Sequence, residues 1–566
     1  MWDRAGAERL KEQFPEAVLG IEESRGEVSV RVEPSEIQKV CQFLKDDPEL
    51  AYDMLIDLCG VDYPLREKRF EVVYLLHSMK GQRRLRLKAA VGEGEAISSV
   101  EGIWRAANWL EREVYDMFGV RFEGHSDLRR ILTWEGFEGH PLRKDFPVEG
   151  EDFGHYELPP EPPDLQPPKR LLEDGDGRYM VVNMGPQHPA THGVLRVLLK
   201  LEGEQIVDAV PVIGHLHRGV EKLAETMTYT QAQTLTDRMD YAAALSNNLA
   251  YMMTVEKLFG VEPPKRAQYI RVMLAEFSRL TSHLLWIATH ALDIGAMTVF
   301  FYAFRERETV LGFIEEITGA RLTPSFMRIG GVAQDLPEGI EERIRKFVDE
   351  FPSRVNEYET LLTKNIIWLK RTRDVGVLSA EEAINYGVTG PVLRGSGVEW
   401  DLRKALPYSS YDEFEFDIPT GERGDTYDRY LVRLEEMRQS ARIIRQALDK
   451  IRETPRGDIR VEDPRLSPPP KEKVQKEIHA LTRHFKHFSE GPAPAPGEAY
   501  CSVEGPKGEL GWYLISDGSP KPYRFRVRPP CFINLAALPV MVKGHLVADV
   551  VSVIGSVDIV LGEIDR

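Results

Sequence analysis

The chain has 566 residues, of which 42% are hydrophobic and 29% are charged, as in ordinary globular proteins. Its length suggests about three or four domains. The formal net charge of −17 argues against a nucleic-acid-binding protein, since such proteins carry a basic surface. No apolar run reaches the roughly 18–20 residues that a membrane-spanning helix needs. The first residues also lack a secretory signal, so we expect a cytosolic protein, and attachment to a membrane through a partner stays open.

The N-terminal part predicts a mixture of strands and helices. Alternating apolar residues indicate strands, and a cap signal at Pro34 indicates the start of a helix. A second helix is expected over residues 103–118. Residues 119–147 are rich in glycine, arginine and aromatic residues without a clear period, which favours a tail that packs on a neighbour. The expected strands cover residues 27–32, 70–76 and 84–88.

A proline-rich, acidic segment divides the chain. Residues 148–176 show no periodicity and are typical of a semi-rigid linker. We therefore expect an N-terminal domain of residues 1–147 and a C-terminal domain of residues 177–566.

The C-terminal part begins with strand patterns and continues with long helical patterns. A buried helix is expected over 266–292, whereas 336–371 and 427–452 are expected to be more exposed. The fold class is thus α+β, with a small α/β N-terminal domain and a large, mainly helical C-terminal domain bearing small sheets at its rim. The other expected strands are 179–183, 194–201, 206–213, 498–503, 512–516 and 523–527, and the other expected helices are 221–259 and 303–318.

The sequence GPQHPATHG contains two histidines, His188 and His192, at a spacing of four. Pro189 between them is incompatible with a helix interior, so a stiff loop is expected rather than a helical zinc site. A metal hydrolase in which His215 and His217 join this pair is a weaker alternative, because a helix-borne ligand pair is missing.

Two further polar clusters lie in apolar surroundings. In DRMDY, Arg238 and Tyr241 are three residues apart, so they would share a face of a helix. A guanidinium beside a phenol lowers the pKa of the phenol, although a structural ion pair is the more ordinary explanation. Asp293 lies three residues after His290, and a carboxylate there would fix the tautomer of an imidazole.

The four cysteines, at positions 41, 59, 501 and 531, form no C-x-x-C pair. An iron–sulfur cluster normally needs clustered thiolates, so we expect no metal and no cofactor bound by this chain alone.

Many separate motifs resemble respiratory complex I. The C-terminal part is similar to the D subunit in GPQHPATHGVLR, IGHLHRGVEKL, DRMDYAAALSNN, THALDIGAMT, LRGSGVEWDLRK, GDTYDRYLVRLEEMRQS and DIVLGEIDR. The N-terminal part is similar to the C subunit in EREVYDMFGVRFEGHSDLRRILT and GHPLRKDFP. The chain thus resembles the fused C/D subunits of bacterial NADH–quinone oxidoreductases from about residue 28 to its end.

The resemblance implies a hydrogenase-large-subunit-like fold for the C-terminal domain. The segment that would match the first metal-binding cysteine pair of a hydrogenase, residues 238–243, has no cysteine, and the chain ends where the second pair would follow. Hydrogenase activity is therefore not expected. In this family, the pocket that holds the metal in hydrogenases lacks the metal and binds the head-group of a quinone instead.

The resemblance also assigns roles to residues. Tyr241 and His192 would give protons to the two quinone oxygens, with Asp293 as the partner of the histidine loop that includes His188. Arg218 and Arg238 would face the 4Fe-4S cluster of the adjacent B subunit. Further residues expected near the quinone cavity are Asp558 and Val560.

The implied protein is a peripheral subunit on the cytoplasmic side of the cell (inner) membrane, with subunits B, I, H, A and G, the membrane arm and quinone as partners, and no nucleic acid. Two alternatives stay open. One keeps the quinone site but takes electrons from ferredoxin or another donor, and the other is a purely structural connecting subunit.

One position departs from the family pattern. Many relatives carry a histidine after Gly-Ala-Arg-Leu, where this chain has Thr323. That histidine is associated with a pH-dependent potential of the terminal cluster, so such proton coupling is not expected here. The departure also favours a low-potential quinone such as menaquinone over ubiquinone.

Overall fold

The computed structural model describes residues 1–150, 171, 178–186 and 193–566. The histidine loop with His188 and His192, and most of the expected linker, lie outside the described residues. Contacts divide the chain into two units. Unit 1 comprises Met1–Lys222, Val375–Thr389 and Cys531–Arg566, and unit 2 comprises Leu223–Asp374 and Gly390–Pro530. The expected boundary at 148–176 stays a prediction.

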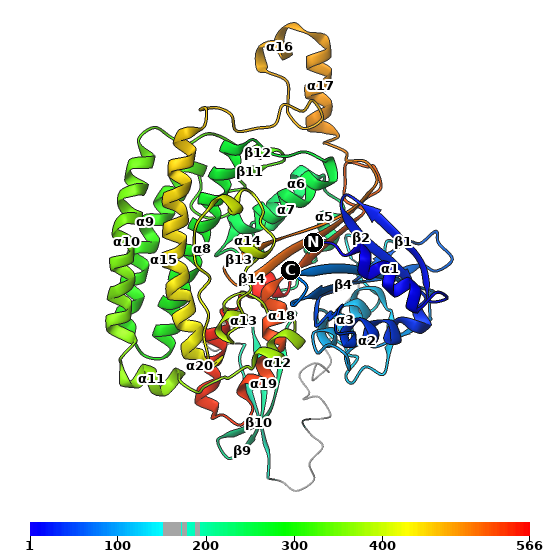
Figure 1. Cartoon of the computed structure of the whole chain (residues 1–566), viewed down its shortest axis with the longest axis vertical. Coiled ribbons are helices and arrows are strands. Elements are labelled where there is room, and N and C mark those ends of the chain that lie inside the picture. The colour runs from blue at the N-terminus through cyan, green and yellow to red at the C-terminus, as the bar shows by residue number, and fades with distance from the viewer. Residues whose placement is uncertain (151–170, 172–177, 187–192) are drawn as a thin grey trace. The chain divides into compact units, whose positions relative to one another are not determined.

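The centre of the N-terminal part of unit 1 is a five-stranded sheet of order β1-β2-β5-β4-β3 (Figure 1). The β2–β5 pair is parallel and the other pairs are antiparallel. Strand β3 packs against α3 so closely that a Cβ on Gly60 would lie 2.7 Å from the Phe118 ring, which explains the glycine. The strands are β1 (Val18–Ser24), β2 (Glu27–Val32), β3 (Met54–Asp62), β4 (Phe70–Ser78) and β5 (Arg83–Val91), and the helices are α1 (Arg4–Gln13), η1 (Pro34–Glu36), α2 (Ile37–Asp46) and α3 (Ala107–Phe118).

The predicted strands β2, β4 and β5 are confirmed, and so is the helix signal at Pro34, which opens a 3-10 turn before α2. Helix α3 begins at Ala107 rather than at residue 103, because Ile103 and Trp104 form turns onto the Val100 carbonyl. Helix α1 and strands β1 and β3 were not predicted.

The rest of unit 1 contains a three-stranded sheet of order β10-β9-β8 and the C-terminal helices. The three strands predicted here are confirmed within two residues at each end. The elements are β6 (Ala96–Ser98), β7 (Arg121–Glu123), β8 (Met180–Met184), β9 (Arg196–Glu202), β10 (Gln205–Val212), α5 (Val220–Ala224), α12 (Ala380–Asn385), α18 (Pro530–Ala536), α19 (Leu538–Val542), α20 (Val547–Val557) and α21 (Leu561–Ile564).

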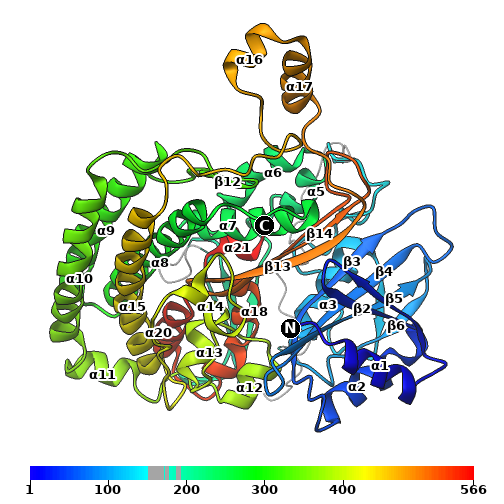
Figure 2. The ribbon, with the colours of Figure 1, turned by 45° about the horizontal axis from the view of Figure 1, so that its top comes forward.

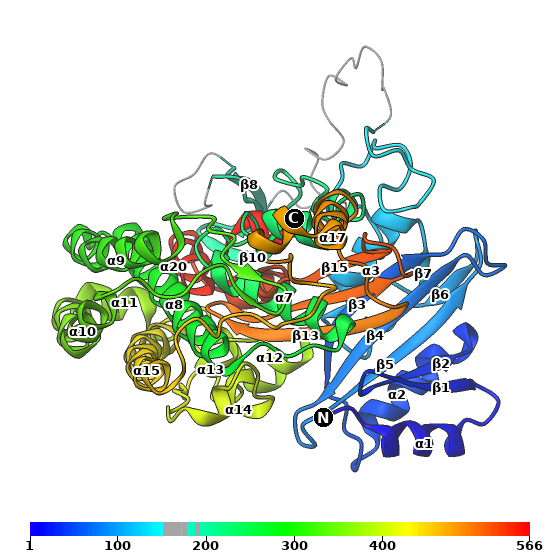
Figure 3. The same cartoon turned by 90° about the horizontal axis from the view of Figure 1, so that it is seen from above.

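Unit 2 is built on four long helices that lie side by side (Figures 1 and 3). They are α8 (Lys265–Asp293), α9 (Met297–Thr318), α10 (Ile340–Leu362) and α15 (Thr426–Glu453). Helix α8 is buried along almost its whole length, as its apolar periodicity predicted. Helices α10 and α15 are more exposed than α8, as expected, although α15 buries the charged residues Arg429, Arg433 and Glu436, which gave the sequence its polar pattern.

A three-stranded antiparallel sheet, β13-β14-β15, packs on α7 in unit 2, and its strands were predicted. Residues 221–259 are largely helical, as predicted, but they form three helices separated by turns rather than a single element. The remaining elements are α6 (Tyr229–Thr236), α7 (Ala244–Phe259), β11 (Met327–Arg328), β12 (Gly331–Val332), α11 (Ile366–Thr372), α13 (Pro391–Gly395), α14 (Leu402–Ala405), η4 (Tyr411–Glu413), α16 (Lys471–Lys476), α17 (Ile478–Ser489), β13 (Gly497–Gly505), β14 (Gly508–Ser516) and β15 (Arg524–Arg528).

The fold is therefore α+β, with a sheet-rich N-terminal part and a larger, mainly helical C-terminal part, as predicted. Among the described residues, no helix has both the length and the apolar content that a bilayer crossing requires.

Candidate functional site

Tyr241 and Arg238 lie on a non-helical turn that joins α6 to α7 in unit 2. The prediction that they share a helical face is therefore wrong. Asp240 breaks the helix, because its carboxylate accepts the Ala242 N–H at 3.1 Å and its carbonyl accepts the Ala243 N–H at 3.0 Å. Arg238 is exposed and donates to the Thr234 carbonyl.

The turn presents Tyr241 outward while it buries its two aspartates. The Tyr241 side chain is 48% exposed, whereas Asp237 and Asp240 are buried. Asn248 donates to Asp237 at 2.7 Å, and Ser325 donates to the other carboxylate oxygen. Burial raises the pKa of Asp237 from its ordinary value, although both hydrogen bonds act to lower it. A phenol exposed on a rigidly held turn is a suitable hydrogen-bond donor to a bound molecule.

A small cavity of about 20 Å³ lies beside Tyr241. Arg307 contributes its guanidinium to the cavity wall and donates to the Thr281 carbonyl at 3.3 Å. Burial lowers the pKa of Arg307 from its ordinary value. The opposite part of the wall comes from a loop that holds Arg321, Leu322 and Pro324.

Lys507 holds the Tyr241 turn in place through an ion pair with Asp240. This lysine is 1% exposed, and its Nζ lies 3.0 Å from Asp240 Oδ2 and 2.7 Å from Ser282 Oγ. It comes from the tight connection between β13 and β14, whose tip is buried in unit 2. The residue that precedes Tyr241 is thus held by a buried ion pair.

A larger set of buried charges continues in the interior of unit 2. Arg394 lies 2.8 Å from Glu504 and 2.7 Å from Glu436, and Glu436 lies 2.8 Å from His283 Nε2. Burial lowers the pKa of His283 to about 4, so the imidazole is neutral and donates to Glu436. Beside them, Arg403 bridges Glu276 and Asp401. Such charges are tolerated because each has an opposite partner.

Asp293 is the last residue of α8 and is half-buried. One turn earlier, His290 is buried, with its ring stacked on Trp286 at a centroid distance of 5.4 Å. The residues expected to partner Asp293, His188 and His192, lie outside the described residues.

In unit 1, Arg218 is bound to the C-terminal segment. Its backbone N–H donates to the Arg566 carbonyl at 2.9 Å, and its guanidinium donates to the Gly562 carbonyl at 2.7 Å. Burial lowers the pKa of Arg218, which Asp565 partly offsets. The Arg218 loop is therefore held against the terminal DIVLGEIDR segment.

Asp565 holds the loop from Gly214 to His217. Its carboxylate accepts the Gly214 and Leu216 N–H groups at 2.9 and 2.7 Å, and its carbonyl lies 2.6 Å from His217 Nδ1. Burial raises the pKa of Asp565. The adjacent Arg566 lies 2.9 Å from Glu113.

Asp558 and Val560 lie between α20 and α21, and both are buried. Asp558 has a left-handed backbone with φ 60°, which aspartate tolerates better than most residues, and ends α20. A groove of about 730 Å³ runs along the start of α20 in the same unit. It is lined, mostly by apolar residues, by Val182, Asn183, Met184, Gly185, Pro186, Leu199, Val547, Ala548 and Val551.

The predicted irregular tail after α3 packs on the second sheet of unit 1. Asp116 holds the tail by accepting the N–H groups of Ile131, Leu132 and Thr133 at 3.1, 2.9 and 2.9 Å. At Gly214 a Cβ would lie 2.5 Å from the Leu132 carbonyl oxygen, so the tail and the histidine-containing loop meet backbone to backbone.

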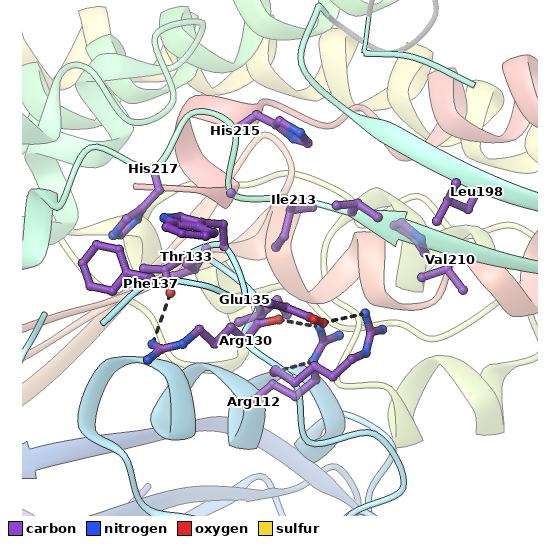
Figure 4. A pocket seen from close by; sticks show the side chains of 17 residues that line it. Arg112, Arg130, Thr133, Glu135, Phe137, Leu198, Val210, Ile213, His215 and His217 are labelled. Atoms are coloured by element: carbon purple, nitrogen blue, oxygen red, sulfur yellow. Dashed lines mark hydrogen bonds and ion pairs between the residues drawn. The ribbon is translucent and has the colours of Figure 1, made fainter. Parts of the chain in front are cut away.

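A pocket of about 390 Å³ opens between this tail and the 213–217 loop (Figure 4). Figure 4 shows His215 and His217 on one side of the pocket and Arg112 and Arg130 on the other. Arg112 and Arg130 are already engaged with the Arg129 carbonyl and with Asp116. The pocket is therefore lined by both the tail and the 213–217 loop, and its two arginines are occupied by contacts within the tail and with α3.

In the part of the chain that the structure describes, no three potential metal ligands of the histidine, cysteine or carboxylate type lie together. Cys41, Cys59 and Cys531 are buried and Cys501 is half-buried.

The sequence-based interpretation missed Lys507 as the support of the Tyr241 turn in unit 2, and Asp565 and Arg566 as supports of the Arg218 loop in unit 1. Lys507 carried a usable signal, since it lies in Gly505-Pro506-Lys507-Gly508 between two predicted strands. A turn of this kind is normally exposed, and only its insertion into the helical unit makes the lysine a buried anchor.

Comparisons with known proteins assign the family. The family described as "Respiratory-chain NADH dehydrogenase, 30 Kd subunit" matches residues 30–152, and "Respiratory-chain NADH dehydrogenase, 49 Kd subunit" matches residues 293–566. A fused C/D subunit of the NADH-quinone oxidoreductase of Aquifex aeolicus, the second of that name, is 45% identical over 100% of both chains.

Two other relatives show the same relation. The C/D subunit of the NADH-quinone oxidoreductase of Bdellovibrio bacteriovorus is 46% identical over 96% of this chain and 95% of its own. The D subunit of the enzyme of the same name from Geotalea uraniireducens is 58% identical over 68% of this chain and 98% of its own. The resemblance seen in the motifs is thus confirmed, and the chain belongs to the family of fused C/D subunits of NADH–quinone oxidoreductase, the respiratory complex I.

Proposed function

We propose that this chain forms the quinone-reduction site of a proton-pumping NADH–quinone oxidoreductase together with the B subunit, and that it couples electron transfer to ion translocation. Electrons arrive from the 4Fe-4S cluster of the B subunit. Each quinone takes up two electrons and two protons to become the quinol. Within the site this chain supplies proton donors and fixes their positions.

Tyr241 and His192 are the proposed proton donors to the two quinone oxygens. Asp293 then exchanges charge with the loop of His188 and His192, and the movement of this loop is the signal to the membrane arm. The observation that carries the proposal is the exposed phenol of Tyr241 on a turn whose preceding residue, Asp240, is fixed by Lys507. A donor held in this way needs little reorganisation when quinone binds.

Two features of unit 1 support the rest of the proposal. The groove along α20 has the volume and apolar lining that an isoprenoid tail requires, and Asp558 and Val560 follow at the end of the same helix. Arg218, fixed to the C-terminal segment, is the proposed neighbour of the partner cluster, with Arg238 as the second arginine.

The experiment is Tyr241→Phe in the assembled complex. Quinone reductase activity is expected to fall by roughly 10²–10⁴-fold, the usual contribution of a positioned proton donor. Electron transfer from NADH to an artificial acceptor that accepts electrons before the quinone should stay unchanged, which shows that the complex is assembled.

Tyr302→Phe is the matched control, since Tyr302 is a partly exposed tyrosine of the same unit, at 38% exposure. It should leave quinone turnover unchanged. Near-normal quinone turnover in Tyr241→Phe would refute the assignment. A photoreactive quinone analogue should label the Tyr241 turn, whereas labelling confined to other subunits would favour a purely structural role for this chain.

The proposal places the chain with subunits B, I, H, A and G at the cytoplasmic face of the inner membrane, and it takes NADH as the donor to the complex. The same site would serve a complex that receives electrons from ferredoxin. Measuring quinone reduction by the purified complex with each donor in turn decides between them.

A further inference from the structure

We propose that helix α17 docks with its apolar face in a groove on another subunit of the same oxidoreductase, and that this groove has an acidic rim. The site is separate from the quinone site, and the inference rests on membership of a multisubunit enzyme rather than on the assignment of Tyr241.

The apolar face of α17 is exposed to an unusual degree. Ile478, Leu481, Phe485 and Phe488 are 69%, 47%, 69% and 68% exposed. They follow one another at intervals of three, four and three residues, which places them in one narrow stripe along the helix. Exposing the apolar surface of two neighbouring phenylalanines to water is unfavourable in free energy, so a contact with a partner that covers them would be stabilised.

The same segment carries the opposite charge to the chain as a whole. Residues 471–489 contain five lysines and arginines and two glutamates, whereas the whole chain has a net charge of −17. Among the described residues, none of these five cations has an ion-pair partner. The five are Lys471, Lys473, Lys476, Arg483 and Lys486.

Helices α16 and α17 contact each other and stand out from the remainder of unit 2 (Figures 1 and 2). The apolar stripe is consequently accessible along the whole of α17. A projecting helix with regularly spaced apolar anchors is the form in which a helix enters a protein groove.

The stripe favours a protein over a membrane as the occupant. The chain belongs to a multisubunit enzyme, so surfaces of other subunits are available to a helix of 12 residues with four apolar anchors, and links to lipid are an outcome of the test below. A second copy of this chain is disfavoured as well, because a twofold contact would bring two basic helices together. The basic flanks instead match a groove bordered by aspartate and glutamate.

The test uses the intact complex with a photoreactive amino acid in place of Phe485. Irradiation is expected to link this chain to one other subunit of the complex, at a segment with acidic residues. The control carries the photoreactive group at Ile367 on α11, which is 62% exposed in the same unit. Links to lipid, links to a second copy of this chain, or the same product from both positions would overturn the proposal.

A second measurement compares two double variants. Phe485→Ser with Phe488→Ser should reduce the content of the linked subunit in the purified complex several-fold, and neutralising the acidic residues of the linked segment should have the same effect. Ile366→Ser with Ile367→Ser removes equally exposed residues and should leave the composition unchanged. Because all four side chains are exposed, both variants should match the unmodified chain in thermal unfolding. An unaltered composition in the phenylalanine variant would refute the docking role.

Discussion

At the scale of single residues, the exposed candidate groups of each unit have buried supports. Tyr241 reaches solvent, but Asp240 beside it is buried against Lys507. Arg218 is similarly held by backbone carbonyls of residues 562 and 566. The sequence identified the exposed residues through motifs, whereas their supports come from distant segments and could not be predicted from local spacing.

The Lys507–Asp240 pair gives the first prediction at this scale. Lys507→Met leaves a buried carboxylate without its cation and should destabilise unit 2 by about 3–5 kcal/mol. The double variant Lys507→Met with Asp240→Asn should recover part of the lost stability, because it no longer has an unpaired buried charge. Denaturant unfolding of the full chain measures both.

Arg321→Gln is the control for this pair, because Arg321 pairs with Glu308 at an exposed position. It should change the stability by less than about 1 kcal/mol. An equal loss in the Lys507 and Arg321 variants would contradict a special role for the buried pair.

Thr323 gives a prediction about the 4Fe-4S cluster that the proposed function assigns to the B subunit. This residue has a left-handed backbone with φ 51°, a conformation that histidine adopts more readily than a β-branched residue. The redox potential of the terminal cluster in the complex should show little dependence on pH. The substitution Thr323→His should make this potential pH-dependent. Redox titrations at several pH values measure the slope, and a clear slope in the unmodified complex would contradict the expectation.

At the scale of elements, helix periodicity located helices best where apolar residues form the buried face. Helix α8 was predicted nearly to its ends. Helix α15 is more exposed than α8, as expected, but its buried face also includes charged residues such as Glu436, which bonds to His283 of α8. The stretch predicted to be helical before α7 is interrupted by a turn, in which the Asp240 carboxylate accepts the Ala242 N–H in place of a helical carbonyl.

Helix α3 supplies a pH-dependent prediction. Burial raises the pKa of Glu111 to about 8, and Ser99 and the Val100 N–H bind its carboxyl at 2.6 and 2.8 Å. The folded state therefore retains a proton that the unfolded state loses above about pH 4.5. This group lowers the free energy of unfolding by about 1.4 kcal/mol per pH unit between these two pKa values.

Glu111→Gln removes that dependence while it keeps the shape of the protonated acid. The stability advantage of the variant over the unmodified chain should be near zero at pH 4.5, grow up to about pH 8 and then stay constant. Unfolding midpoints measured across this range provide the test. A constant difference at all pH values would show that Glu111 is ionised in the folded chain.

At the scale of the whole molecule, unit 1 combines segments from both ends of the chain. Arg566 pairs with Glu113 at 2.9 Å, and Lys222 donates to the Arg143 carbonyl at 2.7 Å. The N-terminal 147 residues are thus joined to the C-terminal part by contacts within unit 1. Relatives that are D subunits alone, such as that of Geotalea uraniireducens, align with 68% of this chain and lack the N-terminal part.

We therefore expect that the two parts of this chain remain together without covalent linkage. A protease site inserted near residue 160 and cleaved after folding should give two fragments that co-elute in size-exclusion chromatography. Arg566→Ala with Asp116→Ala should weaken this association, because the first removes an ion pair and the second releases the tail. Separation of the unmodified fragments at low salt would contradict the prediction.

The sequence by itself determined the family, the α+β class, most strands and the long apolar helices, because apolar periodicity and ordered motifs are properties of consecutive residues. The tertiary structure alone decided that Tyr241 lies on a turn rather than a helix, that Lys507 is a buried anchor and that Asp565 holds the Arg218 loop. These features depend on segments hundreds of residues apart, such as 214 and 565. They arise because each buried charge and each buried backbone group needs a partner, and local sequence patterns do not show where that partner lies.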